Sequence, residues 1–418
     1  MGEHKELVIG LFGFGVVGEG LYHVLHQTPS LKARIKKVCI KHPGKSRNAP
    51  VELFTTEKEA LLNDEEINVI VEVIDDAEAA FDIVKTALQN NKHAVSASKK
   101  MIAEHLPQLL DLQKQTGRSF LYESSACASI PLIRNLEEYY DNDLLHSLRA
   151  IVNGSTNFIL TKIFEENLGF AEALKLAQQL GFAESNPKLD VEGFDAVNKW
   201  TLLLCHAYGI VTSPEKILFN GIQNIHYTDA DVARARGQQI KLVAQAKKLN
   251  AGGVGACVLP QFVKTNNPLA FVKNEYNACI VESSFADEQF FYGKGAGNFP
   301  TASAVLSDIS ALRYDYRYEY KKLYHHKPQQ LNNHVFLKVY VSFDDLAHIP
   351  KNEFEFIDQW HADEFRKYLS GVISLDKLKH STWWKKNGIS LILENEGFIE
   401  DIEAYKSGKK GLALQGFA

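Results

Sequence analysis

The sequence has few of the features that mark membrane, fibrous or disulfide-rich proteins. Its 418 residues include only five cysteines, which are widely spaced and form no C-x-x-C pair of the kind that binds zinc or exchanges thiols. Apolar runs such as residues 68–74 are far shorter than the roughly 20 residues that span a bilayer. The first residues, MGEHKELVIG, lack a basic segment followed by a long apolar stretch, so no signal peptide is expected. These absences predict a cytoplasmic protein that contacts no membrane.

Charge of neither sign dominates the chain. Lysine and arginine number 46 against 51 aspartates and glutamates, which gives a net charge of −5. The basic residues form no long stripe, so nucleic acid is not an expected partner. Hydrophobic residues make up 45% of the sequence, and a chain of this length can bury more than one core in two or three domains.

A glycine-rich turn follows the first apolar run, Leu7 to Phe12. Apolar residues at helical spacing come after the turn, so the order strand, turn, helix is predicted. In a dinucleotide fold the first glycine permits the tight turn, the second lets a pyrophosphate approach, and the third allows close packing of helix against strand. A sharp turn that binds nothing would look similar, but the flanking elements favour a cofactor site made by Gly13, Phe14, Gly15, Val16, Val17 and Gly18.

The second predicted strand, residues 35–40, is followed by basic residues. An NAD-binding fold commonly has an Asp or Glu here, which holds the ribose 2′-hydroxyl. In this chain Lys41, Lys45 and Arg47 take that place. We hypothesise that one of them meets a 2′-phosphate, so NADP is the expected cofactor and NAD a possible one, while a solvated basic loop is the alternative.

Strands and helices alternate through the rest of the first third. Residues 68–74, 93–97 and 119–123 read as strands and residues 78–89 as an amphipathic helix. This alternation predicts the α/β class with a Rossmann-type doubly wound parallel sheet, whose ligands bind at the carboxyl ends of the strands. Lys99 and Glu123 follow two of these strands and are therefore candidate site residues, although either could be a solvated loop charge.

The pattern changes near residue 141, where a second domain is expected to begin. A stretch dense in carboxylates, residues 182–200, precedes and enters an apolar helix. Asp195 and Lys199 are four residues apart on that helix and so lie on one face. They could form an ordinary helical salt bridge, or the carboxylate could orient a catalytic lysine.

Five sequence blocks together resemble the homoserine dehydrogenase family. They are GFGVVG at 13–18, SASKKMIA at 96–103, NGSTNFIL at 153–160, the stretch 181–199, and GKGAGNFPTASAVLSDI at 293–309. The resemblance implies NAD(P)-dependent interconversion of L-homoserine and L-aspartate 4-semialdehyde, in the synthesis of threonine and methionine.

The same resemblance assigns roles to individual residues. Lys199 matches the proton donor, and Lys99 matches a second active-site lysine beside the nicotinamide. Carboxylates that hold the substrate ammonium and order the site are matched by Glu184, Asp190 and Asp195, and a backbone contact to the substrate by Gly181. Gly297 is expected at the cofactor site and near a bound monovalent cation, with sodium as the expected ion. Backbone carbonyls would be the cation's ligands, at positions matched by Glu123, Ala126, Ala128 and Ile130.

The family also suggests how the chain is organised. We expect an NAD(P)-binding domain over residues 1–135, with residues 300–320 packing back onto it, and an α+β substrate-binding and dimerisation domain over residues 136–299. Strands are expected there at 258–263, 277–282 and 289–292. Residues 330–418 are expected to form a small α+β module, which is similar to a degenerate ACT regulatory domain, with strands at 335–343 and 389–393 and a helix at 361–369. The family implies a homodimer or a dimer of dimers.

Some residues depart from the family pattern. Ser98, Lys294 and the pair Asp75-Asp76 stand where the family usually has Asn, Pro and Gly-Gly. A catalytically silent NADP-binding regulator is therefore one alternative. Another is a phosphorylating semialdehyde dehydrogenase that uses Cys127 as its nucleophile.

Overall fold

The structure is a computed structural model that describes residues 6–142, 144–364, 366–394 and 396–410. The chain divides into two compact units. The first unit comprises Met1–Asp143, Asn198–Pro214 and Phe291–Pro328, and the second comprises Leu144–Val197, Glu215–Phe290 and Gln329–Ala418. Within the described parts of the chain, no helix is both long and apolar enough to cross a lipid bilayer.

The first unit is built on a six-stranded parallel sheet in the order β3-β2-β1-β4-β5-β6. Its strands are β1 (Leu7–Phe12), β2 (Ala33–Cys39), β3 (Phe54–Thr55), β4 (Val69–Glu72), β5 (His93–Ser96) and β6 (Phe120–Leu121). The two middle strands are fully buried, as a parallel sheet covered on both faces requires. The predicted doubly wound sheet is confirmed.

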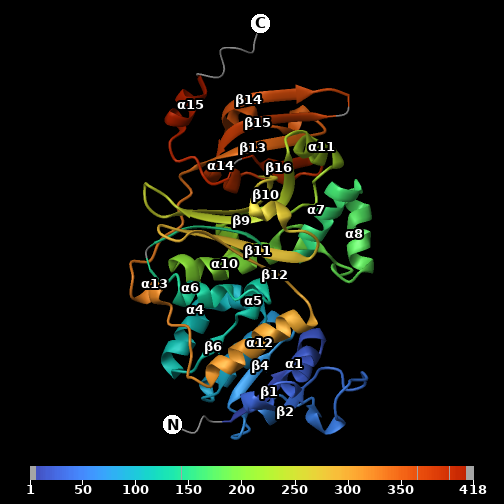
Figure 1. Ribbon diagram of the computed structural model, residues 1–418, viewed down its shortest axis with the longest axis vertical. Coiled ribbons are helices and arrows are strands. Elements are labelled where there is room, and N and C mark those ends of the chain that lie inside the picture. The colour runs from blue at the N-terminus through green and yellow to red at the C-terminus, as the bar shows by residue number, and fades with distance from the viewer. Residues whose placement is uncertain (1–5, 143, 365, 395, 411–418) are drawn as a thin grey trace. The chain divides into compact units, whose positions relative to one another are not determined.

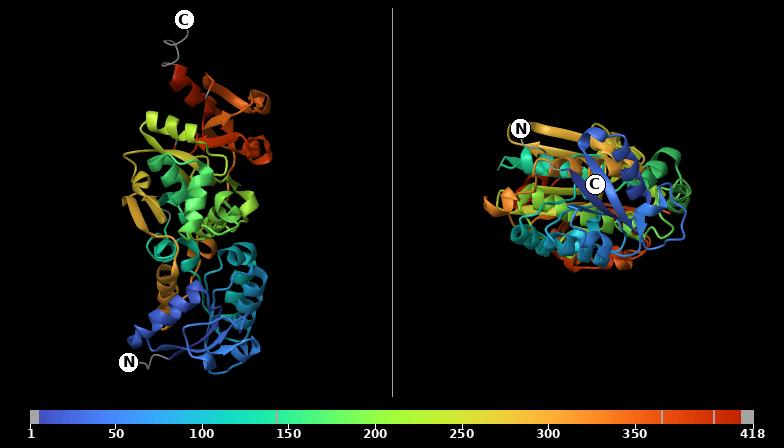
Figure 2. Two further views of the ribbon diagram at one scale, coloured as in Figure 1. Left: turned by 90° about the vertical axis from the view of Figure 1, so that its right-hand side faces the viewer. Right: turned by 90° about the horizontal axis from the view of Figure 1, so that it is seen from below.

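Helices cover both faces of this sheet. They are α1 (Val16–His26), α2 (Glu59–Leu62), α3 (Ala77–Gln89), α4 (Lys99–Thr116), α5 (Ser124–Cys127), α6 (Leu132–Glu138), α12 (Asn298–Leu312) and α13 (Lys321–Tyr324). Helices α1 and α12 lie side by side on one face, and α3 and α4 lie on the other (Figures 1 and 2). A Cβ added at Gly20 of α1 would lie 2.9 Å from the backbone carbonyl oxygen of Asn298, so glycine at this position favours the close approach of the two helices. Residues 298–312 thus belong to the first unit.

The second unit is built on a mixed sheet of ten strands. Nine follow the order β12-β11-β7-β9-β10-β16-β13-β15-β14, and β8 pairs with β10. The strands from the middle of the chain are β7 (Leu145–Ile151), β8 (Leu218–Phe219), β9 (Gln238–Lys248), β10 (Val254–Lys264), β11 (Tyr276–Ser283) and β12 (Asp287–Lys294). Helices α7 (Gly154–Glu166), α8 (Phe170–Gln179), α9 (Lys188–Val191) and α11 (Tyr227–Ala235) belong to the same unit. Helix α10 (Phe194–Tyr208) begins in the second unit and continues in the first.

The C-terminal strands continue the same sheet. They are β13 (Phe336–Phe343), β14 (Phe354–Ala362), β15 (Lys367–Ser374) and β16 (Ile389–Leu393), followed or separated by α14 (Leu375–His380) and α15 (Ile402–Lys410). In their order β16-β13-β15-β14 the first strand, β13, lies between β16 and β15, and β16 joins this group to β10 (Figure 1). One hydrophobic core joins Leu259 of β10 to Leu337 of β13 and Leu391 of β16.

Two elements differ from the sequence-based expectations. The helix predicted over residues 361–369 is wrong, since this segment is the hairpin between β14 and β15, with Trp360 paired to Leu369. Between the two strands, the Asp363 side chain accepts a 2.6 Å hydrogen bond from the backbone of Arg366. Strand β9 was not predicted. Its residues are good helix formers, but it pairs on both sides, with β7 and with β10.

Candidate functional site

The turn between β1 and α1 is shaped by its glycines. Gly13 has a φ of +95°, and a Cβ there would lie 2.9 Å from the carbonyl oxygen of Val73. A Cβ at Gly18 would lie 2.2 Å from the carbonyl oxygen of Gly13, so only glycine lets helix and turn pack this closely. At Gly15 no atom lies within 4 Å of the added Cβ. Because Gly15 is also the N-cap of α1, a phosphate could approach the free N–H groups of the helix there.

The apolar residues of the predicted turn, Phe14, Val16 and Val17, lie beside its glycines. Phe14 packs edge-on against Phe54, with ring centroids 5.0 Å apart. Val16 is 64% exposed, and Val17 is partly exposed. An exposed valine at the start of a helix, above an open turn, leaves apolar surface available for contact with a ligand.

The basic loop after β2 borders a pocket of about 460 Å³ that Lys45, Arg47 and Phe54 help to line. The guanidinium of Arg47 donates to the carbonyl oxygens of Lys45 and His42, each at 2.7 Å, and lies 5.4 Å from the centroid of the Phe54 ring. Arg47 therefore shapes the loop. Lys41 and Lys45 are exposed, and they leave the loop with positive charge that a phosphate could use.

Lys99 is the first residue of α4. The positive end of a helix dipole is an unfavourable place for a cation unless an anion lies nearby. Gly297, at the other end of the unit's sequence, is the N-cap of α12 with a φ of +124°. Both residues thus lie at helix N-termini of the first unit.

Glu123 lies in a buried cluster of charges in the first unit. Its carboxylate accepts hydrogen bonds from the backbone N–H groups of Ile133 (2.8 Å) and Arg134 (2.9 Å). The backbone N–H of Glu123 donates to Asp308, which also forms a 2.9 Å ion pair with Arg134. Burial, with help from Asp308, raises the pKa of Glu123 to about 7. Burial raises the pKa of Asp308 to about 6, although Arg134 opposes the rise.

The segment that follows was predicted to bind a monovalent cation. Ala126, Ala128 and Ile130 are all buried, and Ala128 has a φ of 44°, which a residue with a Cβ seldom adopts. The carboxylate of Glu123 is already hydrogen-bonded to the backbone, so the candidate ligands of the cation are the backbone carbonyls of this segment. Such hard, neutral oxygens suit a monovalent ion.

The second unit brings two of the predicted carboxylates together. The side-chain amide of Asn153 donates to Oδ1 of Asp190 at 2.7 Å and to Oδ2 of Asp195 at 2.8 Å. The amide oxygen of Asn153 accepts a 2.8 Å hydrogen bond from the backbone of Thr156 and so caps α7. One side chain therefore joins the end of β7, the short helix α9 and the start of α10.

The remaining predicted substrate residues lie in the loop between α8 and α9. Gly181 has a φ of +78° and open space where a side chain would be. Glu184 is exposed, and its carbonyl oxygen accepts a 2.9 Å hydrogen bond from Gln178. The hydroxyl of Ser155 donates to the carbonyl oxygen of Phe182 at 2.5 Å, which ties this loop to the N-terminus of α7 near Asn153.

Helix α10 carries both Asp195 and Lys199, one turn apart. Both side chains are buried, with 6% of each residue exposed. An exposed helical salt bridge, one of the two interpretations of this pair, is therefore excluded.

Sequence reasoning missed Asn153 as a site residue. The signal was present, because an asparagine between a predicted strand and a predicted helix is a strong N-cap candidate. It also missed Glu72, a fully buried carboxyl at the end of β4. Cys127, the nucleophile of one alternative function, is buried at the end of α5.

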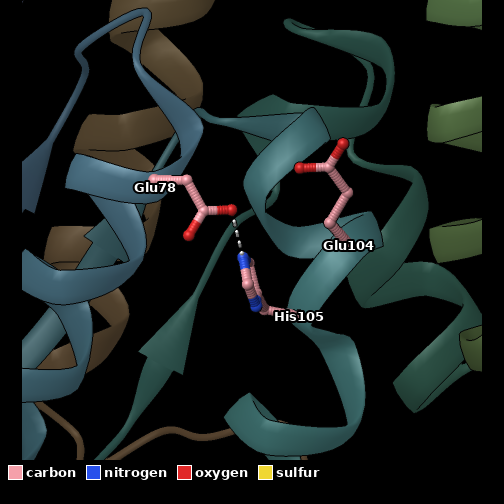
Figure 3. Close-up of side chains that lie close together, drawn as sticks. All are labelled: Glu78, Glu104 and His105. Atoms are coloured by element: carbon pink, nitrogen blue, oxygen red, sulfur yellow. Dashed lines mark hydrogen bonds and ion pairs between the residues drawn. The ribbon is translucent and has the colours of Figure 1, made fainter.

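A cluster of possible metal ligands lies elsewhere in the first unit (Figure 3). Nε2 of His105 lies 3.3 Å from Oε1 of Glu78, and Glu104 is close by. Both carboxylates are exposed, and the His105 ring stacks on Phe81 at 4.0 Å. Pro107 follows two residues later, at the kink that His105 makes in α4. These contacts are explained by the packing of His105 against its neighbours on the helix surface, and we assign no metal to the three residues.

Comparisons with known proteins converge on one family. A family model described as homoserine dehydrogenase matches residues 131–310, and one described as the NAD-binding domain of homoserine dehydrogenase matches residues 13–123. The homoserine dehydrogenase of Bacillus subtilis strain 168 is 36% identical over 317 residues, which cover 74% of this chain and 73% of that protein.

Solved structures give the same result. A homoserine dehydrogenase from Thiobacillus denitrificans superposes with a TM-score of 0.79 at 26% identity, covering 94% of this chain and 98% of the other. A hyperthermophilic archaeal homoserine dehydrogenase in complex with NADPH superposes with a TM-score of 0.65 at 26% identity, covering 75% of this chain and 99% of the other.

Proposed function

The chain belongs to the homoserine dehydrogenase family, and we propose that it interconverts L-homoserine and L-aspartate 4-semialdehyde with NADP preferred to NAD. It is an oxidoreductase with an NAD(P)-binding domain. The observation that carries the proposed reaction is the amide of Asn153, which joins Asp190 to Asp195 on the helix that also bears Lys199.

The glycine turn fits a dinucleotide. The open space at Gly15 and the N-terminus of α1 suit a pyrophosphate. When bound, the dinucleotide supplies the hydride acceptor for C4 of homoserine, or the hydride donor for the aldehyde. Lys99 supplies positive charge beside the nicotinamide, and Gly297 contributes backbone to the cofactor site.

The residues of α9 and α10 handle the substrate. Lys199 takes the hydroxyl proton when homoserine is oxidised and returns it to the aldehyde oxygen in the reverse direction. Asp195, one turn earlier, orders the site. Asp190, Asp195 and Glu184 hold the substrate ammonium, and the backbone of Gly181 contacts the substrate.

The first experiment follows reduced cofactor by its absorbance at about 340 nm after L-homoserine is mixed with NADP or NAD. We expect reduction by the wild type and its loss in Lys199→Ala. Lys188→Ala, at an exposed lysine on α9, is the control and should keep full activity. Near-normal turnover by Lys199→Ala would overturn the acid-base role, and no reduction by folded wild-type protein would overturn the reaction.

The preference for NADP rests on the basic loop. We expect a higher kcat/KM with NADP than with NAD, and a reduced difference in Lys45→Ser, which removes an exposed charge from the pocket beside Phe54. A clear preference of the wild type for NAD would reject the proposal.

A monovalent cation, with sodium as the proposed ion, is held by backbone carbonyls of the segment from Glu123 to Ile130. It would stabilise a buried turn in which Ala128 has a positive φ. Activity is compared in buffers whose monovalent cation is sodium, potassium or tetramethylammonium. Equal activity and thermal stability in all three would reject the cation.

The family supports our proposals for assembly and regulation, and the first residues, which show no signal-peptide pattern, support our proposal for location. We propose that the protein acts in the cytoplasm, in threonine and methionine synthesis, as a homodimer or dimer of dimers formed through the sheet of the second unit. The strand order of the C-terminal module supports an ACT-like arrangement in which short 3₁₀ turns, Leu346–His348 and Lys351–Glu353, replace the first helix. Sedimentation tests the assembly. Feedback inhibition by threonine through this module is the proposed regulation, and activity that stays flat as threonine is added would reject it.

Neither alternative function is favoured by the comparisons. A phosphorylating dehydrogenase would need an accessible thiolate, whereas Cys127 is fully buried. Cys127→Ser should therefore change turnover little.

A further inference from the structure

Glu72 is a buried carboxyl that the proposed reaction does not use. It is the last residue of β4, in the middle of the parallel sheet, and is 0% exposed. Its Oε1 accepts a 2.6 Å hydrogen bond from the backbone N–H of Ile74, and its Oε2 accepts a 2.6 Å hydrogen bond from the hydroxyl of Ser96. Both donors are uncharged.

The position of Glu72 is central to the proposed cofactor site of the first unit. In the register of the sheet, Glu72 pairs with Phe12 of β1 on one side and with Ser96 of β5 on the other. Strand β1 leads directly into the glycine turn, and β5 leads into α4, which begins at Lys99. In open α/β sheets, ligands bind at the carboxyl ends of such neighbouring strands.

On one side, Glu72 controls the loop that packs against the glycine turn. A Cβ added at Gly13 would lie 2.9 Å from the carbonyl oxygen of Val73 and 3.1 Å from Cγ2 of Ile74. The backbone N–H of Val73 donates to the carbonyl oxygen of Phe12 at 3.0 Å, and the bond from Ile74 to Glu72 holds the next residue. If the bond to Glu72 were lost, Ile74, which packs against the glycine turn, would lose the hydrogen bond that fixes its backbone.

On the other side, Glu72 controls the start of α4. The hydroxyl of Ser96 donates to Glu72 and accepts a 3.0 Å hydrogen bond from the backbone N–H of Ser98. The carbonyl oxygen of Glu72 also accepts a hydrogen bond from the backbone N–H of Ala97, at 3.2 Å. Ser98 is the N-cap of α4 and makes no side-chain cap bond, so Ser96 and Glu72 orient this N-terminus and with it Lys99.

A carboxyl in this place is costly to bury. Desolvation, with a contribution from nearby Asp75, raises the pKa of Glu72 to about 7. An apolar residue would avoid this penalty in a strand whose other residues are apolar. The carboxyl offsets this penalty by accepting the hydrogen bonds from Ile74 and Ser96.

We propose that Glu72 is a positioning residue for the cofactor, because it couples the glycine turn to the N-terminus of α4 and so sets Lys99 against the bound dinucleotide. This inference rests on the proposed function for the role of Lys99. The cofactor is recognised by two loops, and Glu72 with Ser96 holds both.

The test measures the Kd for NADPH from the fluorescence of the bound cofactor, without homoserine, alongside kcat, the KM for homoserine and the melting temperature. Glu72→Ala removes both bonds. We expect its Kd to rise about tenfold and its kcat to fall about tenfold, as a loss of about one strong hydrogen bond would give, with the KM for homoserine unchanged. Glu72→Gln keeps an acceptor for Ile74 and a polar partner for Ser96, so it should restore most of the affinity.

Two further variants separate positioning from general stability. Ser96→Ala breaks the connection to α4 while leaving the bond to Ile74, so it should lower kcat more than it weakens NADPH binding, and it remains informative if Glu72→Ala does not fold. Asp229→Asn alters another fully buried carboxyl, in the second unit, which accepts a 3.0 Å hydrogen bond from Tyr340. It should lower the melting temperature without changing the Kd for NADPH.

The proposal is overturned if Glu72→Ala and Ser96→Ala lower only the melting temperature, or if Glu72→Gln binds NADPH no better than Glu72→Ala. The affinity for NADPH does not depend on homoserine oxidation. A wild type that binds NADPH but does not oxidise homoserine would therefore contradict the proposed reaction. The effect of Glu72 on NADPH affinity could still be measured.

Discussion

Replacing Asn153 by serine should separate the chemistry of the carboxylate cluster from the stability of the second unit. Serine at an N-cap can still accept the hydrogen bond from Thr156, as Asn153 does at 2.8 Å. It cannot reach Asp190 and Asp195, to which the amide donates at 2.7 and 2.8 Å. Asn153→Ser therefore removes the two donors and keeps the cap.

The expected loss follows from the partners of those donors. A hydrogen bond to a charged group contributes about 1.5 to 3 kcal/mol. Waters can replace part of it, so we expect a loss near that of one such bond, about 1.4 to 2.8 kcal/mol or 10- to 100-fold in kcat/KM for homoserine. Asn153→Asp should lose more, because it keeps the cap but adds a third negative charge to two carboxylates.

The assay varies homoserine at saturating NADP and measures NADPH affinity and thermal unfolding on the same samples. We expect the kinetic loss with NADPH affinity and melting temperature near those of the wild type. Asn267→Ser is a matched control. Asn267 also caps a helical turn, the 3₁₀ helix Pro268–Phe271, by accepting from Leu269 at 2.9 Å, and it donates to the Glu396 carboxylate at 2.6 Å. Wild-type kcat/KM in both Asn153 variants would refute the assignment of this cluster to the substrate.

Two other predictions concern the glycine turn and a buried lysine. Gly18→Ala places a Cβ 2.2 Å from a backbone oxygen and should destabilise the protein by about 1 to 3 kcal/mol. Gly15→Ala should leave the melting temperature unchanged and weaken NADPH binding. Normal NADPH binding by Gly15→Ala would contradict the assignment of this turn to the cofactor. Burial lowers the pKa of Lys241 from 10.5 to about 7. Between these two pH values the unfolded chain carries a proton on Lys241 that the folded protein lacks. The free energy of unfolding should therefore rise with pH by up to about 1.4 kcal/mol per pH unit. The measurement is urea unfolding between about pH 7.5 and 9.5. Lys241→Met should remove the slope, and Lys175→Met, at an exposed lysine, should keep it. Equal slopes in the wild type and both variants would show that Lys241 is not neutral when folded.

Much of the first unit could be predicted because its signals are local. The apolar run, the three glycines and the helical spacing after them all lie within residues 7–25, and each acts on its immediate neighbours. The turn at Gly13, the tight contact at Gly18 and the open space at Gly15 follow from this spacing. The carboxylates of α9 and α10 were also recognisable, because the family pattern lies within one short stretch.

The interactions of these residues were less predictable, because they join distant parts of the chain. Asn153 donates to carboxylates 37 and 42 residues away. The partner of Glu72, Ser96, lies 24 residues away and becomes its neighbour only when β4 and β5 pair. Within the strand pattern of residues 68–74, nothing local distinguishes a buried glutamate from one at a solvated strand end.

Local pattern by itself determined the doubly wound sheet, the glycine turn and the residue types available for chemistry. Tertiary structure alone decided that residues 238–248 form β9, since pairing with β7 and β10 and the burial of residues 240–246 outweigh a composition that favours helix. It also decided that residues 361–369 form a hairpin, where cross-strand pairs such as Trp360 with Leu369 replace the contacts of a helix. The physical reason is the same in each case: propensity acts over a few residues and contributes little per residue, whereas strand pairing and burial depend on partners that only the folded chain brings together.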